Sequence, residues 1–129
     1  MNMLFSAMLM LLIYTPSFAQ KPTCQDFHEG SFSITTAGTG TTMITRTKKQ
    51  QIEESEQYGY KLLFDIVWTD ECTYELRPKK VLRGDPAIFE NGKIVLRTRI
   101  KQITNSGYTA ETSSNFSPAV MEFEVRMLK

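Results

Sequence analysis

The sequence contains few residues whose types could support acid–base, nucleophilic or metal chemistry. His28 is the only histidine, so a Ser–His–Asp triad or a histidine-rich zinc site would have to use it. It lies in a polar stretch just before Gly30, where a lone histidine is usually a solvated side chain. The short run Gly38-Thr39-Gly40 lacks the Gly-Lys-Ser/Thr that completes a phosphate loop. We therefore predict no catalytic residue, no metal site and no cofactor.

Clustered carboxylates are the second chemical possibility. Glu53, Glu54 and Glu56 form the densest acidic group in the chain. Paired carboxylates can act as general acid and base when their surroundings separate their pKa values. Lys48 and Lys49 lie close by in the sequence, which is typical of a solvated, charged strand edge. We favour the strand edge, and a hydrolase that uses the cluster is a remote alternative.

The two cysteines, Cys24 and Cys72, are the third candidate pair. An even number of cysteines in an exported domain indicates a disulfide. The bond would close a loop of about 49 residues, for which the chain-entropy model gives a stabilisation of about 4 kcal/mol. Two free, buried thiols are the alternative.

Aromatic and methionine side chains could line a binding cavity. In a closed eight-stranded barrel the interior is either filled by side chains or holds one small ligand. We leave both possibilities open. The side chains that would line a cavity are Phe32, Phe64, Trp68, Tyr74, Met121 and Phe123.

The secondary structure that positions these residues is predicted from a hydrophobic pattern with a period of two residues. Between Met121 and Met127, for example, apolar residues alternate with Glu122, Glu124 and Arg126. Such alternation is typical of strands with one buried and one solvated face. A helix over residues 48–58 is the local alternative. We predict about eight strands, near residues 30–36, 41–48, 51–57, 60–69, 73–82, 93–103, 107–114 and 119–128.

Turn signals separate the predicted strands. Asn91-Gly92 is a two-residue hairpin signal, because both residues tolerate a positive φ. Residues 38–40, 84–86 and 105–107 also combine glycine with other turn-forming residues. Short connections between sequential strands indicate a single-domain, all-β, antiparallel up-and-down sheet. We predict that it closes into a small lipocalin-like barrel, and a β-sandwich is the alternative.

The first twenty residues differ from the rest of the chain, because all 15 Lys and Arg and all 14 Asp and Glu follow them. Their apolar run ends before Ser17 and Ala19, small residues at the positions that a signal peptidase inspects. We predict a signal peptide over residues 1–19 and one β domain over residues 20–129. The apolar run is shorter than the roughly 20 residues of a membrane-spanning helix, so a retained membrane anchor is the less favoured alternative. The expected location is the periplasm or the extracellular space.

Two motifs of the mature chain allow comparison with known families. They are Cys24-x-x-Phe27-x-x-Gly30-x-Phe32 and Trp68-Thr69-x-x-Cys72-x-Tyr74-x-Leu76. The chain resembles a family of small exported proteins of Bacteroidetes-type bacteria with no established activity, some of which are labelled DNA topoisomerase IV. The size and charge of this chain do not fit that label. The resemblance implies the disulfide and a compact β fold. The first motif is also similar to the Gly-x-Trp opening of lipocalins, which implies a carrier role by fold analogy alone.

The expected function is non-enzymatic binding by an exported barrel. The partner would be a small apolar ligand or a protein of the cell envelope, and a structural or interaction module with a filled core is the alternative. The net charge of +1 provides no basic surplus for nucleic acid. The oligomeric state stays open.

Overall fold

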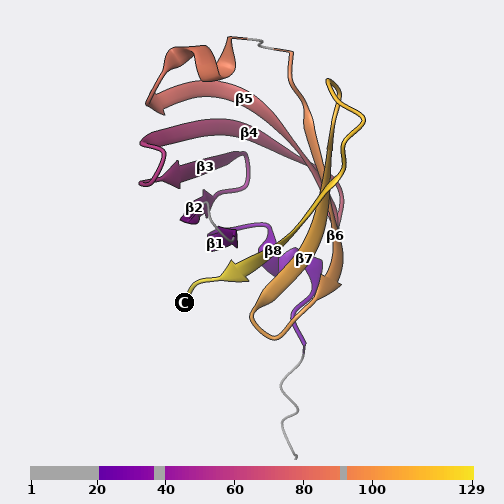
Figure 1. The fold of residues 1–129 in the computed structure, drawn as a ribbon. Helices are drawn as coiled ribbons and strands as arrows, with labels where there is room; N and C mark the ends of the chain where they lie inside the picture. Colours follow the sequence, from indigo (N-terminus) through magenta and orange to yellow (C-terminus); the bar gives the residue numbers. More distant parts are fainter. Residues whose placement is uncertain (1–20, 37–39, 91–92) are drawn as a thin grey trace, which may run out of the picture.

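The computed structural model describes residues 21–36, 40–90 and 93–129, in which eight strands and two short 3-10 helices form (Figure 1). None of the helices in this described part has the length and apolar character needed to cross a bilayer. The helices are η1 (Cys24–Phe27) and η2 (Pro86–Phe89). The strands are β1 (Gly30–Thr36), β2 (Gly40–Arg46), β3 (Gln50–Ser55), β4 (Tyr60–Asp70), β5 (Thr73–Arg83), β6 (Leu96–Ile103), β7 (Gly107–Ser114) and β8 (Met121–Met127).

The strands form one closed antiparallel barrel in sequence order. Each strand pairs with its neighbours in the chain, and β8 pairs with β1 to close the sheet. Closure pairs the two strands that would otherwise be exposed edges. The predicted all-β up-and-down barrel is therefore confirmed, and the alternative β-sandwich does not form.

The predicted strands agree with the observed ones to within a few residues. The mixed polar segment before Tyr58 forms β3 rather than a helix. The predicted Asn91-Gly92 hairpin falls outside the described residues, and η2, which the sequence analysis did not predict, precedes it. The predicted turn at Gly38-Thr39 and the predicted signal peptide over residues 1–19 also lie outside them.

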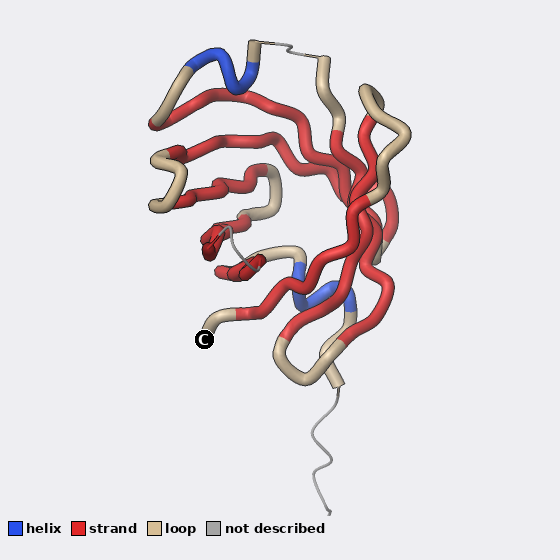
Figure 2. The backbone as a smooth tube through the Cα atoms, viewed as in Figure 1, coloured by secondary structure: helices blue, strands red, loops and turns tan. Residues whose placement is uncertain are grey.

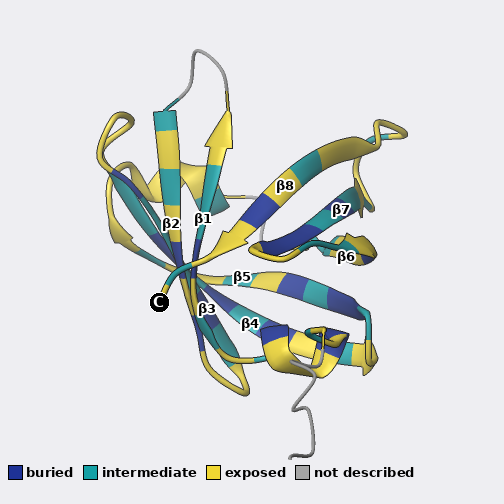
Figure 3. Cartoon of the chain, turned by 90° about the horizontal axis from the view of Figure 1, so that it is seen from below, coloured by how far each residue is buried: buried dark blue, intermediate teal, exposed yellow. Residues whose placement is uncertain are grey.

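Buried and exposed residues alternate along the strands, which places one face of the sheet inside the barrel (Figure 3). The buried residues form two clusters. One comprises Cys24, Phe27, Phe32, Ile44, Ile100, Tyr108, Ala110 and Val125. The other comprises Leu62, Phe64, Ile66, Tyr74 and Leu76 on β4 and β5.

The helix η1 covers one end of the barrel, which we call the closed end (Figure 2). Cys24 of η1 forms a disulfide with Cys72 in the turn between β4 and β5, with the Cα atoms 5.2 Å apart. The ring of Phe27 packs against Tyr108 with centroids 5.1 Å apart. The predicted disulfide is confirmed, and it attaches η1 to the barrel wall.

The two halves of the barrel, β1–β5 and β6–β8, separate toward the other end, which we call the open end. β5 pairs with β6 only between Thr73 and Leu76, so the rest of β5 pairs with β4 alone. β1 pairs with β8 at Phe32 and Ser33. Both seams between the halves are therefore joined near the closed end.

Glycine is required where β7 approaches β8. A Cβ added at Gly107 would collide with the backbone oxygen of Val125. Gly30, at the start of β1, has a φ of +132°, which disfavours any L side chain. These two glycines allow the chain to leave η1 and to close the sheet at β8.

Candidate ligand cavity

A cavity of about 270 Å³ lies inside the barrel, where the two halves separate. Both halves contribute to its wall, and the lining combines apolar side chains with an equal number of polar ones, although most of the exposed lining surface is apolar. The apolar lining residues are Ile34, Ile44, Leu76, Leu96, Met121 and Phe123. The polar ones are Thr36, Gln51, Glu53, Tyr74, Thr98 and Thr112.

The six side chains expected to line a cavity are divided between the cavity and the core. Tyr74, Met121 and Phe123 line the cavity. Phe32 and Phe64 are buried in the two core clusters, and Trp68 packs against both of them. The first cluster therefore fills the closed end, whereas toward the open end the interior is divided between the cavity and the second cluster, where Phe64 packs against Phe89 of η2.

Arg46 lies between the cavity and the closed end, and 2% of its surface is exposed. Its Nε donates to Gln51 Oε1 at 2.8 Å, and its Nη1 donates to the Phe27 carbonyl oxygen at 2.8 Å. Its Nη2 donates to the hydroxyls of Tyr74 and Tyr108 at 3.3 and 3.1 Å. All four acceptors are uncharged groups, so the guanidinium is satisfied by hydrogen bonds without a direct carboxylate partner.

Aromatic rings also stabilise the Arg46 charge. The guanidinium carbon lies 4.7 Å from the ring centroids of both Phe32 and Tyr74, within the range of cation–π attraction. Burial acts to lower the pKa of Arg46, but the neighbouring hydroxyls of Tyr74 and Tyr108 act in the opposite direction, and the pKa is raised overall. Arg46 is therefore a permanent positive charge inside the barrel.

Gln51 connects Arg46 to a carboxylate that lines the cavity. Gln51 of β3 lies directly opposite Arg46 of β2 in the sheet. Because Gln51 Oε1 accepts from Arg46, its Nε2 is free to donate to Glu53 Oε1, at 2.9 Å. Gln51 is almost fully buried, so its orientation is determined by these two contacts.

Glu53 is partly buried and lines the cavity. Burial raises the pKa of its carboxyl group, while the hydrogen bond from Gln51 and the charge of Arg46 act more weakly to lower it. Tyr74 of β5, which also lines the cavity, has a pKa well above its usual value, chiefly because of burial. The cavity thus contains one carboxylate whose charge is poorly solvated and one tyrosine that stays neutral.

The sequence analysis did not identify Arg46 and Gln51, and it placed Glu53 on a solvated edge. The available signal was strand parity. Residues 44 and 46 share one face of β2, and residues 51 and 53 share one face of β3, so the buried Ile44 predicts that Arg46 also faces inward. Charged residues at inward-facing positions are uncommon unless they are paired or functional.

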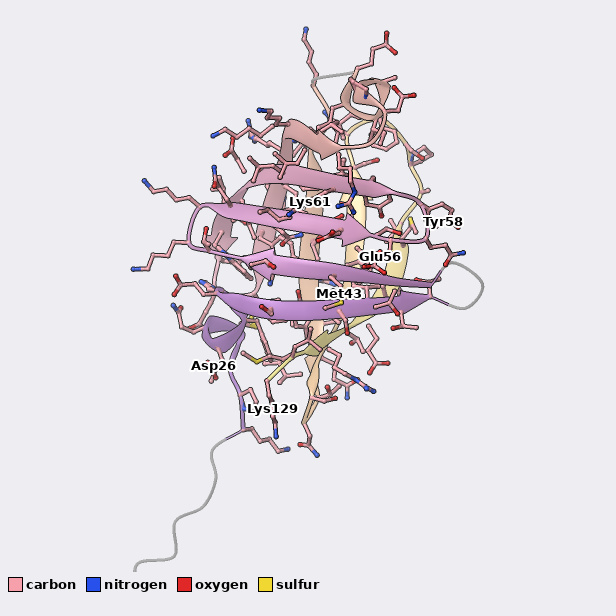
Figure 4. All side chains as sticks on the ribbon, turned by 90° about the vertical axis from the view of Figure 1, so that its left-hand side faces the viewer. Asp26, Met43, Glu56, Tyr58, Lys61 and Lys129 are labelled. Atoms are coloured by element: carbon pink, nitrogen blue, oxygen red, sulfur yellow. A yellow bond between two sulfur atoms is a disulfide. The ribbon has the colours of Figure 1, made fainter. Side chains whose placement is uncertain are left out.

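The structure separates the three carboxylates of the predicted acidic cluster. Glu53 faces the interior, whereas Glu54 faces outward and forms an ion pair with Arg83 at 3.0 Å. Glu56 lies in the exposed turn after β3, near Met43 on the outer wall (Figure 4). Adjacent residues of a strand point to opposite faces, so the sequence cluster does not form one carboxylate site.

A second hollow, of about 520 Å³, lies on the outer wall beside Glu54 and Glu56. Its lining side chains come from the solvated face of β2 and β3 and from the turn that follows. It lacks the apolar walls of the interior cavity, because Met43 is the one apolar side chain among its described lining residues. We therefore take the interior cavity as the candidate site.

His28, Asp70 and Glu71 form structural contacts at the closed end. The His28 ring stacks on Trp68 with centroids 3.6 Å apart, and its Nε2 lies 2.8 Å from the Glu71 carbonyl oxygen. Asp70 accepts a hydrogen bond from the Cys72 backbone at 2.9 Å, and this bond lowers the pKa of Asp70. These contacts, together with the disulfide, hold η1 against the β4–β5 turn.

The described residues contain no group of three or more His, Cys, Asp or Glu that could hold a metal ion. The chemistry available in the cavity is therefore that of Glu53, Gln51, Tyr74 and the threonine hydroxyls. Comparison with known protein families, with curated proteins and with solved structures finds no match.

Proposed function

We propose that this protein is a non-enzymatic binding protein that holds a small, largely apolar molecule in the interior cavity. The observation that carries the proposal is the cavity itself, which both halves of the barrel line and whose wall includes Gln51 and Tyr74 of the Arg46 network. Ligand sites are commonly concave and apolar, with a few placed polar groups. This description matches the lining.

The size of the cavity supports a small ligand. Sites for drug-sized molecules typically measure about 300–1,000 Å³, and this cavity has about 270 Å³. Six of its lining residues are apolar, so the main favourable contribution to binding would come from burial of hydrocarbon surface. The role would be similar to that of lipocalin-type carriers, by analogy of fold.

The proposed location is the periplasm or the extracellular space. The disulfide indicates an oxidising compartment, and the signal peptide expected over residues 1–19 would direct the chain there. A ligand carrier outside the cytoplasm would encounter its ligand in the envelope or in the medium.

Binding to a partner protein is the second candidate function, because apolar side chains are exposed at the open end. Phe116 and Val120 belong to the connection between β7 and β8, Met121 begins β8, and all three are more than half exposed. Ile88 of η2 is exposed at the same end. Exposed apolar groups of this kind mark interaction surfaces when they are contiguous.

Native mass spectrometry of the exported, disulfide-bonded protein, followed by organic extraction, tests the proposed function. We expect a stoichiometric small molecule that is lost when the cavity is filled by Leu96→Trp. Arg97→Trp is the matched control, because Arg97 is the next residue of β6 and faces solvent. Equal ligand occupancy in both variants would contradict binding in this cavity. A bare mass would favour the partner-binding candidate.

A further inference from the structure

We infer that the cavity selects ligands that carry a protonated amine. Glu53 is the counter-charge for the amine, and the apolar lining residues contact the hydrocarbon part of the ligand. This inference rests on the proposed ligand-binding function and specifies the chemical class of the ligand. It is carried by the position of one carboxylate in a wall whose exposed surface is mostly apolar.

The neighbours of Glu53 in the sheet are apolar. Glu53 lies directly opposite Ile44 on β2 and Leu62 on β4, and both of these residues are buried. An ionised carboxylate can accept about four hydrogen bonds, but the described residues supply one, from Gln51 Nε2. The remaining acceptor capacity of Glu53 is available to a ligand in the cavity.

Arg46 does not neutralise Glu53 directly. Four hydrogen bonds to uncharged acceptors engage its guanidinium, and the Gln51 amide stands between the two charges. The effect of Arg46 on the pKa of Glu53 is smaller than that of burial, and the pKa is raised overall. Gln51 therefore positions the carboxylate, and its charge stays poorly compensated.

A ligand ammonium group is the partner that best fits this arrangement. It would donate charge-assisted hydrogen bonds to Glu53 and restore the interactions lost with water. A ligand carboxylate would be repelled, and a wholly apolar ligand would leave Glu53 desolvated without a partner. The hydrocarbon part would contact Ile34, Leu76 and Phe123.

The inference also predicts how affinity depends on pH. The charged or titratable groups that face Glu53 are Arg46 on β2 and Tyr74 on β5, and both keep one charge state near neutrality. The described lining residues of β1, β6, β7 and β8 do not titrate. Protonation of Glu53 removes its charge, so affinity for an ammonium ligand should fall as the pH decreases through the raised pKa of Glu53.

Isothermal titration calorimetry with three probes of similar shape tests the inference on the exported, disulfide-bonded protein. The probes are phenethylamine, phenethyl alcohol and hydrocinnamate, which are positive, neutral and negative at neutral pH. We expect phenethylamine to bind at least about tenfold more tightly than the alcohol, and hydrocinnamate to bind most weakly. Only the affinity for the amine should decrease on acidification.

Variants of Glu53 test whether its carboxylate causes the preference for the amine. Glu53→Gln should abolish the preference for the amine and keep binding of the alcohol, whereas Glu53→Asp should retain part of the preference. Glu54→Gln is the matched control, because Glu54 is adjacent and faces outward. It should behave like the unaltered protein.

Two results would overturn the inference while leaving ligand binding in the cavity intact. One is equal affinity for the amine and the alcohol in the unaltered protein, and the other is an unchanged preference in Glu53→Gln. Failure of all three probes to bind would also overturn it. Native mass spectrometry, which uses no added probe, would then show whether the proposed ligand-binding function fails as well.

Discussion

The side chains of Arg46, Gln51 and Glu53 place two opposite charges inside a barrel whose other inward residues are mostly apolar or carry hydroxyl groups. The charges do not touch, because the Gln51 amide accepts from one and donates to the other. Arg46 is surrounded by hydrogen-bond acceptors and aromatic rings. Glu53 has fewer partners, so the two residues should differ in their effect on stability.

Arg46 should be essential for stability. Arg46→Met removes the donor for the Phe27 carbonyl oxygen and for Gln51 Oε1, both of which are in the buried interior. Each buried acceptor that is left without its donor costs about 1–3 kcal/mol, so the loss of two such donations costs several kcal/mol. We expect a decrease of this size in the free energy of unfolding, measured by urea titration.

The control for this prediction is a surface arginine. Arg99→Met removes an exposed ion pair with Glu111, whose atoms are 2.9 Å apart. Such pairs contribute about 0–1 kcal/mol. Equal stability of the two methionine variants would show that the Arg46 network does not stabilise the fold.

Glu53 should reduce stability at neutral pH. Its folded-state pKa is raised, so the folded state binds its proton more tightly than the unfolded state does. The resulting stabilisation is fully present below the usual carboxyl pKa and is lost as the pH rises through the raised value. Glu53→Gln should therefore increase the free energy of unfolding at neutral pH by about 1 kcal/mol.

The pH profile distinguishes this prediction from a general effect of the substitution. Urea titrations from acidic to neutral pH should show that the advantage of Glu53→Gln over the unaltered protein disappears below the usual carboxyl pKa. The outward Glu54→Gln variant should show no such advantage. A Glu53→Gln variant that is less stable at neutral pH would mean that Arg46 compensates the carboxylate fully.

At the scale of elements, η1 closes the barrel only because it is held at several points. The disulfide attaches Cys24 to the β4–β5 turn, the Phe27 carbonyl oxygen accepts from Arg46, and the His28 ring stacks on Trp68. A four-residue 3-10 helix has little stability of its own. Its position therefore depends on these contacts.

Removal of the disulfide should destabilise the protein and release η1. For Cys24→Ala/Cys72→Ala we expect a loss of about 4 kcal/mol in the free energy of unfolding, because the open chain gains entropy when unfolded. Trp68 is the only tryptophan, so its fluorescence should report the loss of the His28 stack before global unfolding. Coincident loss of fluorescence and of far-ultraviolet circular dichroism would show that η1 does not detach separately.

At the scale of the whole molecule, the barrel has one sealed and one open end. Antiparallel up-and-down order places the turns after β2, β4 and β6 at the closed end with η1. The seams between the two halves are paired near that end. The cavity therefore forms where the halves separate, and the exposed Phe116 and Val120 belong to a connection at its open side.

The sequence by itself determined the class of fold and the placement of the strands. Period-two alternation and turn residues are local signals, and they predicted the eight strands and the up-and-down order. The even number of cysteines predicted the disulfide. Only the tertiary structure decided which interior positions are packed and which line a cavity. That division depends on the separation of the two halves, which strand parity does not encode. The tertiary structure also decided that Glu53 contacts Gln51, and Gln51 contacts Arg46, inside the barrel. In the sequence, these three polar residues of β2 and β3 are equally compatible with a solvated edge. Only the pairing of the strands determines which face of the sheet they occupy.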